Sequence, residues 1–140
     1  MPTRRLRRGK DREDLFQWLG GQDNIQAPFK RLKDVFVVAA CLGYTYGQES
    51  KLAPGGEQFG QTVFSAQDEA IFNAIAIAHF GQVEVLHPDR EEERLDVIEQ
   101  YANEGVVLLR EMARKGLDPL EEVLAALARE EGERVPGIPK

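Results

Sequence analysis

The stretch LKDVFVVAACLGYTYG, residues 32–47, decides the fold of this chain of 140 residues. Within it, residues 35–42 are eight consecutive residues without a polar side chain. A helix that is apolar all round is buried all round, so this run predicts the central element of the core. Gly43 follows the run and predicts its end, because glycine readily adopts the left-handed conformation that closes many helices. The residues just before the run are basic, which places a positive patch beside the most buried element.

The whole chain has the composition of an ordinary globular domain, with 42% hydrophobic and 30% charged residues. Its length suits one domain that buries its own core. No stretch approaches the roughly 18 apolar residues that span a bilayer, and the arginine-rich N-terminus lacks the apolar region of a signal peptide. The single cysteine, Cys41, lies inside the apolar run. We therefore expect a cytoplasmic protein with no membrane contact and with Cys41 buried as an inert thiol.

Hydrophobic periodicity predicts a mainly α fold, a compact bundle of about five helices. A long polar loop, residues 44–64, separates the second helix from the third, and QTVF at its end is compatible with a short β pairing. The expected domain layout is a flexible basic arm over residues 1–9, one helical domain over residues 10–131 and a loose tail over residues 132–140. The expected helices span residues 10–19, 28–42, 68–80, 89–115 and 120–131.

Local signals mark several of these helices. Ser65 and Asp68 have the spacing of a capping box before the third helix, which stops at Gly81. Asp118 is placed to cap the last helix, which opens with a proline. Gly105 costs the long fourth helix about 1 kcal/mol relative to alanine, so another backbone is expected to pack closely there.

Side-chain spacing predicts the buried faces of three helices. Alanines along the third helix would let a neighbouring helix approach, and residues 83–86 alternate like a short strand or extended connector. The predicted faces are Ala70, Ala74, Ala76 and Ala78 on the third helix, Ile98, Tyr101, Gly105, Leu108 and Met112 on the fourth, and Leu120, Val123, Leu124 and Leu127 on the fifth.

The sequence contains few signals of catalysis. Neither His79 nor His87 has a partner at metal-ligand spacing, and Cys41 has no evident base. The glycine-rich segment 53–60 lacks the Lys-Ser/Thr of a phosphate-binding loop. The acidic run DREEER, residues 89–94, is most simply a solvated helix face, because metal sites need converging carboxylates. We therefore predict no catalytic residue, no metal site and no cofactor.

Charge is distributed unevenly along the chain. The net charge is −6, yet residues 1–35 carry a balance of +4 and the remainder a balance of −10. An acidic protein can still bind nucleic acid, because binding depends on where positive charge clusters. The basic N-terminal third is therefore the place to look for a DNA contact.

Two groups of cations, with one lysine in the long loop, form the predicted interface. The N-terminal arm could neutralise phosphates or enter a minor groove, but it could equally be a solubilising tail or dock on the acidic half of the chain. The second group lies on the opening turn of the predicted second helix, where backbone N–H groups favour an anion, or is an ordinary solvated surface. The candidate DNA-binding residues are Arg4, Arg5, Arg7, Arg8, Lys10, Arg12, Lys30, Arg31, Lys33 and Lys51.

Four blocks of the sequence resemble a known family. They are FKRLKDVFVVAACLGYTYG, GGEQF, VFSAQDEAIFNAIAIA and ERLDVIEQYANEGVVLLRE, within residues 8–115. The chain resembles the bacterial Dnd system-associated proteins, the fourth so named, which are encoded beside the genes for DNA phosphorothioation and its linked restriction machinery. Phosphorothioation replaces a non-bridging phosphate oxygen by sulfur. The resemblance carries no catalytic signature and implies an accessory role.

A fainter resemblance extends to DndE, a small helical component of the modification complex. It rests on the order of helices and loop, on the pair Asn24 and Ile25, and on Gly105 followed by aliphatic residues. This resemblance implies an oligomer that binds DNA through surface lysines. The acidic C-terminal half departs from a DNA-coating surface, and the helix after Lys115 lies outside the resemblance.

Taken together, these observations predict a non-enzymatic accessory protein of a DNA phosphorothioation or related anti-phage defence system. Its expected partners are the DNA backbone, contacted without sequence specificity, other Dnd-type modification or restriction proteins, and further copies of itself. The alternative is a purely protein-binding or oligomeric scaffold subunit without DNA binding. A third possibility, a nuclease or sulfur-transfer enzyme, would need clustered carboxylates or a reactive thiol, and the sequence shows neither. Whether phosphorothioate or unmodified DNA is recognised stays open at this point, because a pocket for sulfur depends on tertiary structure.

Overall fold

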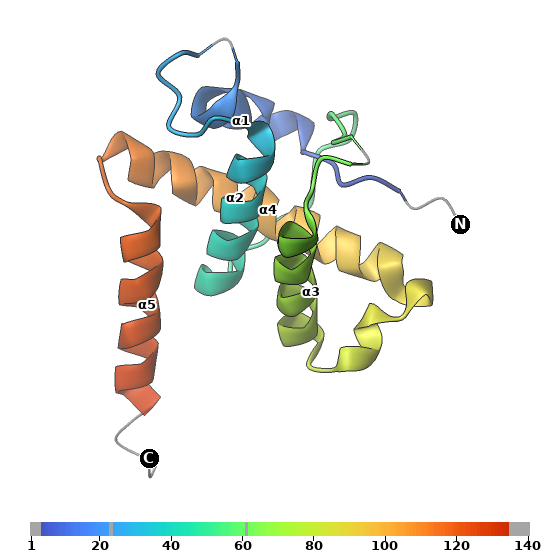
Figure 1. The fold of residues 1–140 in the computed structure, drawn as a ribbon. Coiled ribbons are helices and arrows are strands. Elements are labelled where there is room, and N and C mark those ends of the chain that lie inside the picture. Colours follow the sequence, from blue (N-terminus) through green and yellow to red (C-terminus); the bar gives the residue numbers. More distant parts are fainter. Residues whose placement is uncertain (1–3, 23, 61, 135–140) are drawn as a thin grey trace.

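The computed structural model describes residues 4–22, 24–60 and 62–134, and confirms a mainly α fold. The helices are α1 (Glu13–Gly20), α2 (Leu32–Tyr46), α3 (Ala66–Phe80), α4 (Glu91–Arg114) and α5 (Pro119–Arg134), with 3₁₀ turns at Lys10–Arg12, Val83–Leu86 and Pro88–Arg90. In Figure 1, α4 runs across the molecule, α2 and α3 cross it, and α5 leaves its C-terminal end. Within the described residues, none of the helices combines the length and apolarity needed to cross a bilayer.

The contact between α2 and α4 is the most extensive between any two described elements. Two glycines let the backbones touch. A Cβ atom on Gly105 would lie 1.7 Å from the carbonyl oxygen of Ala39, and one on Gly43 would lie 2.1 Å from that of Tyr101. The prediction of close packing at Gly105 is therefore confirmed, and α2 is the helix that packs there.

The bounds of α2 differ from the predicted 28–42. The helix starts later because the backbone N–H of Phe29 donates to the Leu19 carbonyl at 2.9 Å, and Arg31 is still extended. It also continues through Gly43 and ends at Gly47, which has a φ of 65°. Gly43 was wrongly predicted as the stop, because a glycine serves a close helix crossing as well as a helix end.

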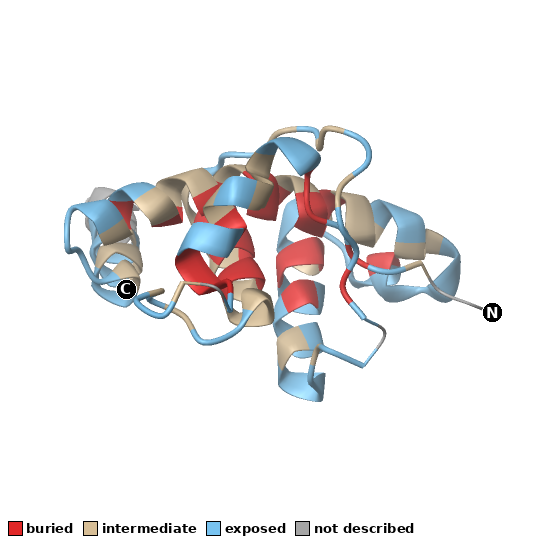
Figure 2. Cartoon of the chain, turned by 90° about the horizontal axis from the view of Figure 1, so that it is seen from above, coloured by how far each residue is buried: buried red, intermediate tan, exposed pale blue. Residues whose placement is uncertain are grey.

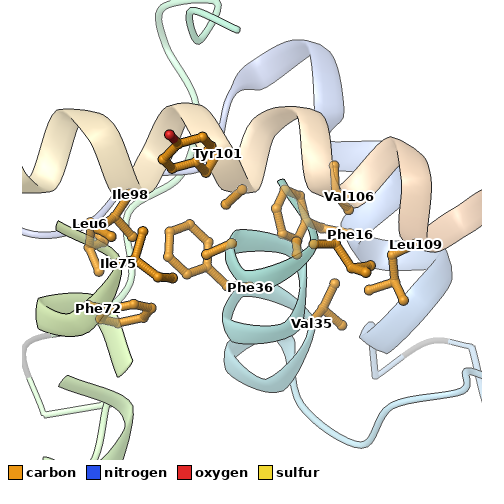
Figure 3. Packing of buried hydrophobic residues seen from close by; sticks show 14 of the residues in the cluster. Leu6, Phe16, Val35, Phe36, Phe72, Ile75, Ile98, Tyr101, Val106 and Leu109 are labelled. Atoms are coloured by element: carbon orange, nitrogen blue, oxygen red, sulfur yellow. The ribbon is translucent and has the colours of Figure 1, made fainter. Parts of the chain in front are cut away.

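The core centres on Phe36, which is fully buried on α2. Its ring packs against those of Phe16, Phe59 and Phe72 at centroid distances of 6.3, 5.1 and 5.8 Å. Figure 3 shows Phe16, Phe36 and Phe72 among the buried side chains beneath α4, and Figure 2 shows that burial is concentrated at the crossing of α2 and α4. The prediction that the apolar run forms the core is confirmed, although Cys41 is only half-buried.

The third helix confirms one prediction and corrects another. Ser65 and Asp68 form the complete capping box, and Gly81 closes the helix at a φ of 74°. Of the predicted alanines, however, only Ala76 is buried, while the other three are exposed. The helix lies across the edge of the core and buries only one face, so the alanines of its outer face meet no neighbouring helix.

The predicted extended segments take other forms. Residues 62–64 of QTVF form no strand, and Gln61 lies outside the described residues. The pairing instead joins Arg7 to Gln58 as an isolated antiparallel bridge. Residues 83–86 form a 3₁₀ turn rather than a strand, because alternation over four residues does not distinguish the two.

The last helix uses only part of its predicted apolar face. Val123 packs against the core, and the Tyr46 hydroxyl donates to the Glu122 carbonyl at 3.2 Å. Leu120, Leu124 and Leu127 remain 65%, 56% and 47% exposed. The prediction that all four residues are buried was wrong because α5 contacts the rest of the domain along one edge only, so its three leucines point towards solvent.

We predict that Gly105→Ala lowers the free energy of unfolding by about 3 kcal/mol, the upper end of the usual cost of overpacking. In a helix with no other backbone packed against it, the same change would stabilise the protein by about 1 kcal/mol. The sign of the change in unfolding free energy therefore shows whether α2 packs closely against Gly105. Urea denaturation followed by far-ultraviolet circular dichroism measures it. Glu111→Ala, at an exposed position of the same helix, is the control and should change the value by less than about 0.5 kcal/mol. A neutral or stabilising Gly105→Ala would contradict the contact.

Candidate functional site

Residues 4–9, expected as part of a flexible arm, lie against the domain. The Arg8 N–H donates to the Glu57 carbonyl, and the Phe59 N–H donates to the Leu6 carbonyl, both at 2.9 Å. Leu6 is buried at 7% exposure and belongs to the hydrophobic core. This docked segment, which we call the N-terminal strap (residues 4–9), therefore contributes to the fold. Residues 1–3 lie outside the described part of the chain.

Two arginines of the strap converge on one buried carboxylate of α4. Glu99 is 2% exposed and accepts from Arg4 Nη1 at 2.6 Å, from Arg7 Nη2 at 2.9 Å and from the Arg7 backbone N–H at 2.8 Å. Arg4 Nε also lies 2.7 Å from Glu92 Oε1. The hydrogen bond to Glu99 raises the pKa of Arg7. Removing one partner of such a buried pair is strongly destabilising, so these arginines have a structural role.

The remaining cations of this region divide into paired and unpaired ones. Arg8 is buried, donates to both Glu13 oxygens at 2.8 and 3.1 Å, and lies 4.7 Å from the centroid of the Phe59 ring. Arg12 donates to the Asn103 carbonyl at 2.9 Å. Arg5 and Lys10 are exposed and form no ion pair within the described residues. Of the six cations predicted in and beside the arm, two, Arg5 and Lys10, are thus free among the described residues.

The second predicted group lines a hollow at the start of α2, which we call the basic hollow. Its volume is about 690 Å³. Among the residues that the structure describes, four cations line it together with three amide side chains and no carboxylate-bearing residue. Its lining consists of Arg8, Gln17, Gly20, Gln22, Lys30, Arg31, Leu32, Lys33, Gln58, Phe59, Gly60 and Val63.

The three cations of the second group differ in how freely they can meet a ligand. Lys30 is exposed and forms no ion pair in the described part of the chain. Arg31 is 67% exposed and pairs with Asp34 at 3.1 Å. Lys33 is only 12% exposed and donates to Asp68 at 2.6 Å. An exposed ion pair contributes about 0–1 kcal/mol, so Arg31 can exchange its partner at little cost, whereas Lys33 is held.

Two neighbouring hollows have a different electrostatic character. The hollow beside Arg4 and Arg5 also contains Glu69 and Glu91 in its lining. Lys51 lines another hollow together with Asp96 and Glu99, so the structure does not bring Lys51 together with Lys30. Acidic side chains would repel a phosphate in both places, which leaves the basic hollow as the better anion site.

The acid that holds Lys33 also caps α3. Burial alone would raise the pKa of Asp68, but the hydrogen bonds from Lys33 and Ser65 outweigh burial and hold that pKa below its usual value. The carboxylate accepts from the Ser65 backbone N–H at 2.9 Å. A single side chain therefore links the start of α3 to the first turn of α2.

Cys41, His79 and His87, the residue types that most often act as nucleophiles or metal ligands, are each half-buried or hydrogen-bonded within the fold. Burial raises the pKa of the Cys41 thiol, which keeps it protonated at neutral pH. His79 Nδ1 lies 2.7 Å from the Tyr101 hydroxyl, and His87 caps the 3₁₀ turn that follows it. Among the described residues, no three His, Cys, Asp or Glu side chains are grouped as a metal site would require.

Sequence reasoning missed two sets of residues at this site. Docking of the arm on the acidic half of the chain was one of the alternatives, but it named no residues, although Glu92, Asp96 and Glu99 repeat at intervals of four and three along one face of the fourth helix. The apolar wall of the basic hollow had no such signal. Phe59 and Val63 come from the long loop, whose lack of periodicity gives no indication of what it faces.

These observations define a small helical protein with a cation-lined hollow and with most of its buried charges engaged in internal pairs. A comparison with known families matches residues 5–137 to the family described as DNA sulphur modification system-associated protein 4. The chain therefore belongs to this family of Dnd-associated accessory proteins, and the match includes α5, beyond the predicted limit at residue 115. No curated protein and no solved structure matches the chain. The resemblance to DndE stays a prediction.

We predict that Asp68→Asn lowers the free energy of unfolding at pH 7 by about 1 kcal/mol, because the half-buried Lys33 loses the negative charge with which it pairs. Because the folded pKa of Asp68 is depressed, its stabilisation is present above the unfolded value of about 3.9 and is lost as pH falls through the folded pKa. The difference between wild type and variant should therefore close below about pH 4. Urea denaturation across this range measures it.

Glu69→Gln is the matched control for this prediction. It removes an exposed carboxylate from the same first turn of α3. Its difference from wild type should stay small at every pH. A difference for Asp68→Asn that persists unchanged at pH 2.5 would mean that the carboxylate charge plays no part.

Proposed function

We propose that this chain is a non-enzymatic accessory protein of a DNA phosphorothioation or related anti-phage defence system, and that it contacts the DNA backbone at the basic hollow. The observation that carries the proposal is that the described part of the hollow's lining contains four cations and no carboxylate. Family membership supports the accessory role. The non-enzymatic character is supported by the charged side chains themselves, because Glu13, Asp68 and Glu99 each hold an internal cation.

The contact depends on the cations that are free to meet phosphate. Lys30 supplies an exposed charge, and Arg31 can replace its exposed pair with Asp34 by a bidentate contact to a phosphate. Lys10 is exposed and can extend the contact along a backbone, whereas Arg5 and Lys51 line the two hollows that also contain carboxylates. Arg4 and Arg7 are committed to Glu99 and stabilise the fold instead. Because base edges play no part, binding is expected to be independent of sequence.

The protein partners proposed for this chain are other modification or restriction proteins of the same system. The family is defined by its association with DNA sulphur modification. A small accessory protein that contacts the DNA backbone weakly would gain affinity if a partner held it on the same DNA, because linked contacts raise the effective concentration.

We predict that binding to a short duplex weakens steeply with salt and that Lys30→Gln combined with Arg31→Gln flattens this dependence. Each lost phosphate contact changes the slope of log K against log salt by about 0.9, so the double variant should lose about 1.8. Fluorescence anisotropy over a series of salt concentrations measures the slope. Substitutions are preferable to deleting residues 1–9, because the strap carries buried Leu6 and Arg8.

Arg114→Gln is the control for charge alone. Arg114 is exposed at the far end of α4 and pairs with Glu111 at 2.9 Å. Its removal should leave the slope unchanged. An equal loss with Arg114→Gln, or no binding by wild type even at low salt, would overturn the proposed DNA contact.

The second candidate function is an oligomeric scaffold subunit without DNA binding. The exposed leucine stripe of α5 favours it, because three large apolar side chains on one helix face leave an apolar surface in contact with water. The family match includes this helix. The same fold is compatible with both candidate functions, which differ in whether the basic hollow binds DNA or the leucines of α5 bind another copy of the chain.

An oligomer formed through α5 predicts a solution mass that is a multiple of the monomer mass. Leu120→Glu combined with Leu124→Glu should reduce it to the monomer, since charged side chains would then be buried in the contact. Light scattering after size-exclusion chromatography measures both masses. Val83→Glu, another exposed apolar position, is the control. A monomeric wild type would rule out this scaffold.

A further inference from the structure

We propose that the basic hollow selects a sulfur-bearing phosphate diester, a phosphorothioate, over the ordinary all-oxygen diester. This inference rests on the proposed DNA contact and adds to it the chemical class of the ligand. It follows from the fact that one hollow presents cations and an apolar wall together.

The apolar wall is formed by three residues of the lining. Phe59 is 5% exposed and is held in place by the rings of Phe36 and Phe64, both at centroid distances of 5.1 Å. Val63 is 39% exposed and Leu32 is half-buried. Because Phe59 is part of the aromatic core, this wall is rigid where a ligand would meet it.

The same hollow also provides the positive charge and the hydrogen-bond donors that a negatively charged phosphate needs. Lys30 and Arg31 belong to its lining and are exposed, and Gln17, Gln22 and Gln58 add amide donors. Arg8 lies against the Phe59 ring, but Glu13 already occupies its guanidinium. The hollow can therefore pair one charged oxygen with donors while its apolar wall offers none.

This arrangement distinguishes sulfur from oxygen. Both diesters carry one negative charge, so the cations attract both. The two non-bridging oxygens of an ordinary diester both need hydrogen bonds, and an oxygen turned towards Phe59 and Val63 would lose its water without a replacement donor. A sulfur atom is larger, more polarisable and a weaker acceptor, so it loses less on leaving water and gains dispersion contacts with the wall.

The geometry also implies stereoselectivity. A phosphorothioate diester has two diastereomers, because sulfur can replace either non-bridging oxygen. Because Lys30 and Arg31 belong to the segment before α2 whereas Phe59 and Val63 belong to the long loop, only one diastereomer can direct sulfur to Phe59 and Val63 and oxygen to Lys30 and Arg31. A selective hollow should therefore prefer one diastereomer over both the other and the all-oxygen form.

The test compares three versions of one short duplex: the all-oxygen form and the two separated diastereomers with a single phosphorothioate. Fluorescence anisotropy at low salt gives the three dissociation constants for the wild-type protein. One diastereomer is expected to bind about tenfold more tightly than the all-oxygen duplex, the discrimination typical of one unpaired polar group or one apolar contact.

Val63→Thr is the variant that tests the wall. It replaces a methyl group by a hydroxyl at nearly the same volume and gives oxygen a partner. The ratio between the preferred diastereomer and the all-oxygen duplex should fall towards one, without loss of all-oxygen binding. Val83→Thr makes the same change at a valine that is 63% exposed and outside the lining, and it should keep the wild-type ratio. Urea midpoints of both variants check that they fold.

The outcomes separate this inference from the function on which it rests. Equal binding of all three duplexes by wild type, or a ratio that Val63→Thr does not change, would overturn sulfur selection and leave the DNA contact standing. Absence of binding to every duplex at low salt would overturn both. Lys30→Gln should weaken all three by a similar factor, because the charge attracts both kinds of diester.

Discussion

The structure depends on the direct contact between the backbones of α2 and α4. Gly105 admits the Ala39 carbonyl, and Gly43 admits that of Tyr101, so neither helix has room for a side chain at the crossing. This close approach places the apolar run of α2 against the middle of α4 and brings Phe36 into the aromatic core. It also leaves the acidic face of α4 beside the crossing, where the N-terminal strap can reach it.

Ion pairs inside the fold determine which positive charges are left exposed on the surface. The strap places Arg4 and Arg7 on Glu99, and Arg8 on Glu13, so most of its positive charge is satisfied within the fold. The positive charge left for a ligand therefore lies mainly at the start of α2. A chain with a net charge of −6 can in this way keep one hollow whose described lining contains cations and no carboxylate.

Part of the candidate site could be predicted from the sequence because it is local. Lys30, Arg31 and Lys33 are neighbours in the chain, so their proximity needed no tertiary information. Phe59 and Val63 could not be placed beside them, because the long loop has no periodicity and its path depends on backbone pairing with the strap. The sequence likewise could not show which cations were already paired, since Arg7 and Glu99 lie 92 residues apart.

The sequence by itself determined the helical class, the apolar run, the capping box at Ser65 and the glycine at the helix crossing. These features follow from hydrogen bonds and side-chain spacings within a few residues, which the sequence displays directly. Only the tertiary structure decided that α2 passes Gly43, that the strap docks, and that the leucines of α5 stay exposed. Each of these depends on what a distant segment buries or pairs with, and that is settled only when the helices pack.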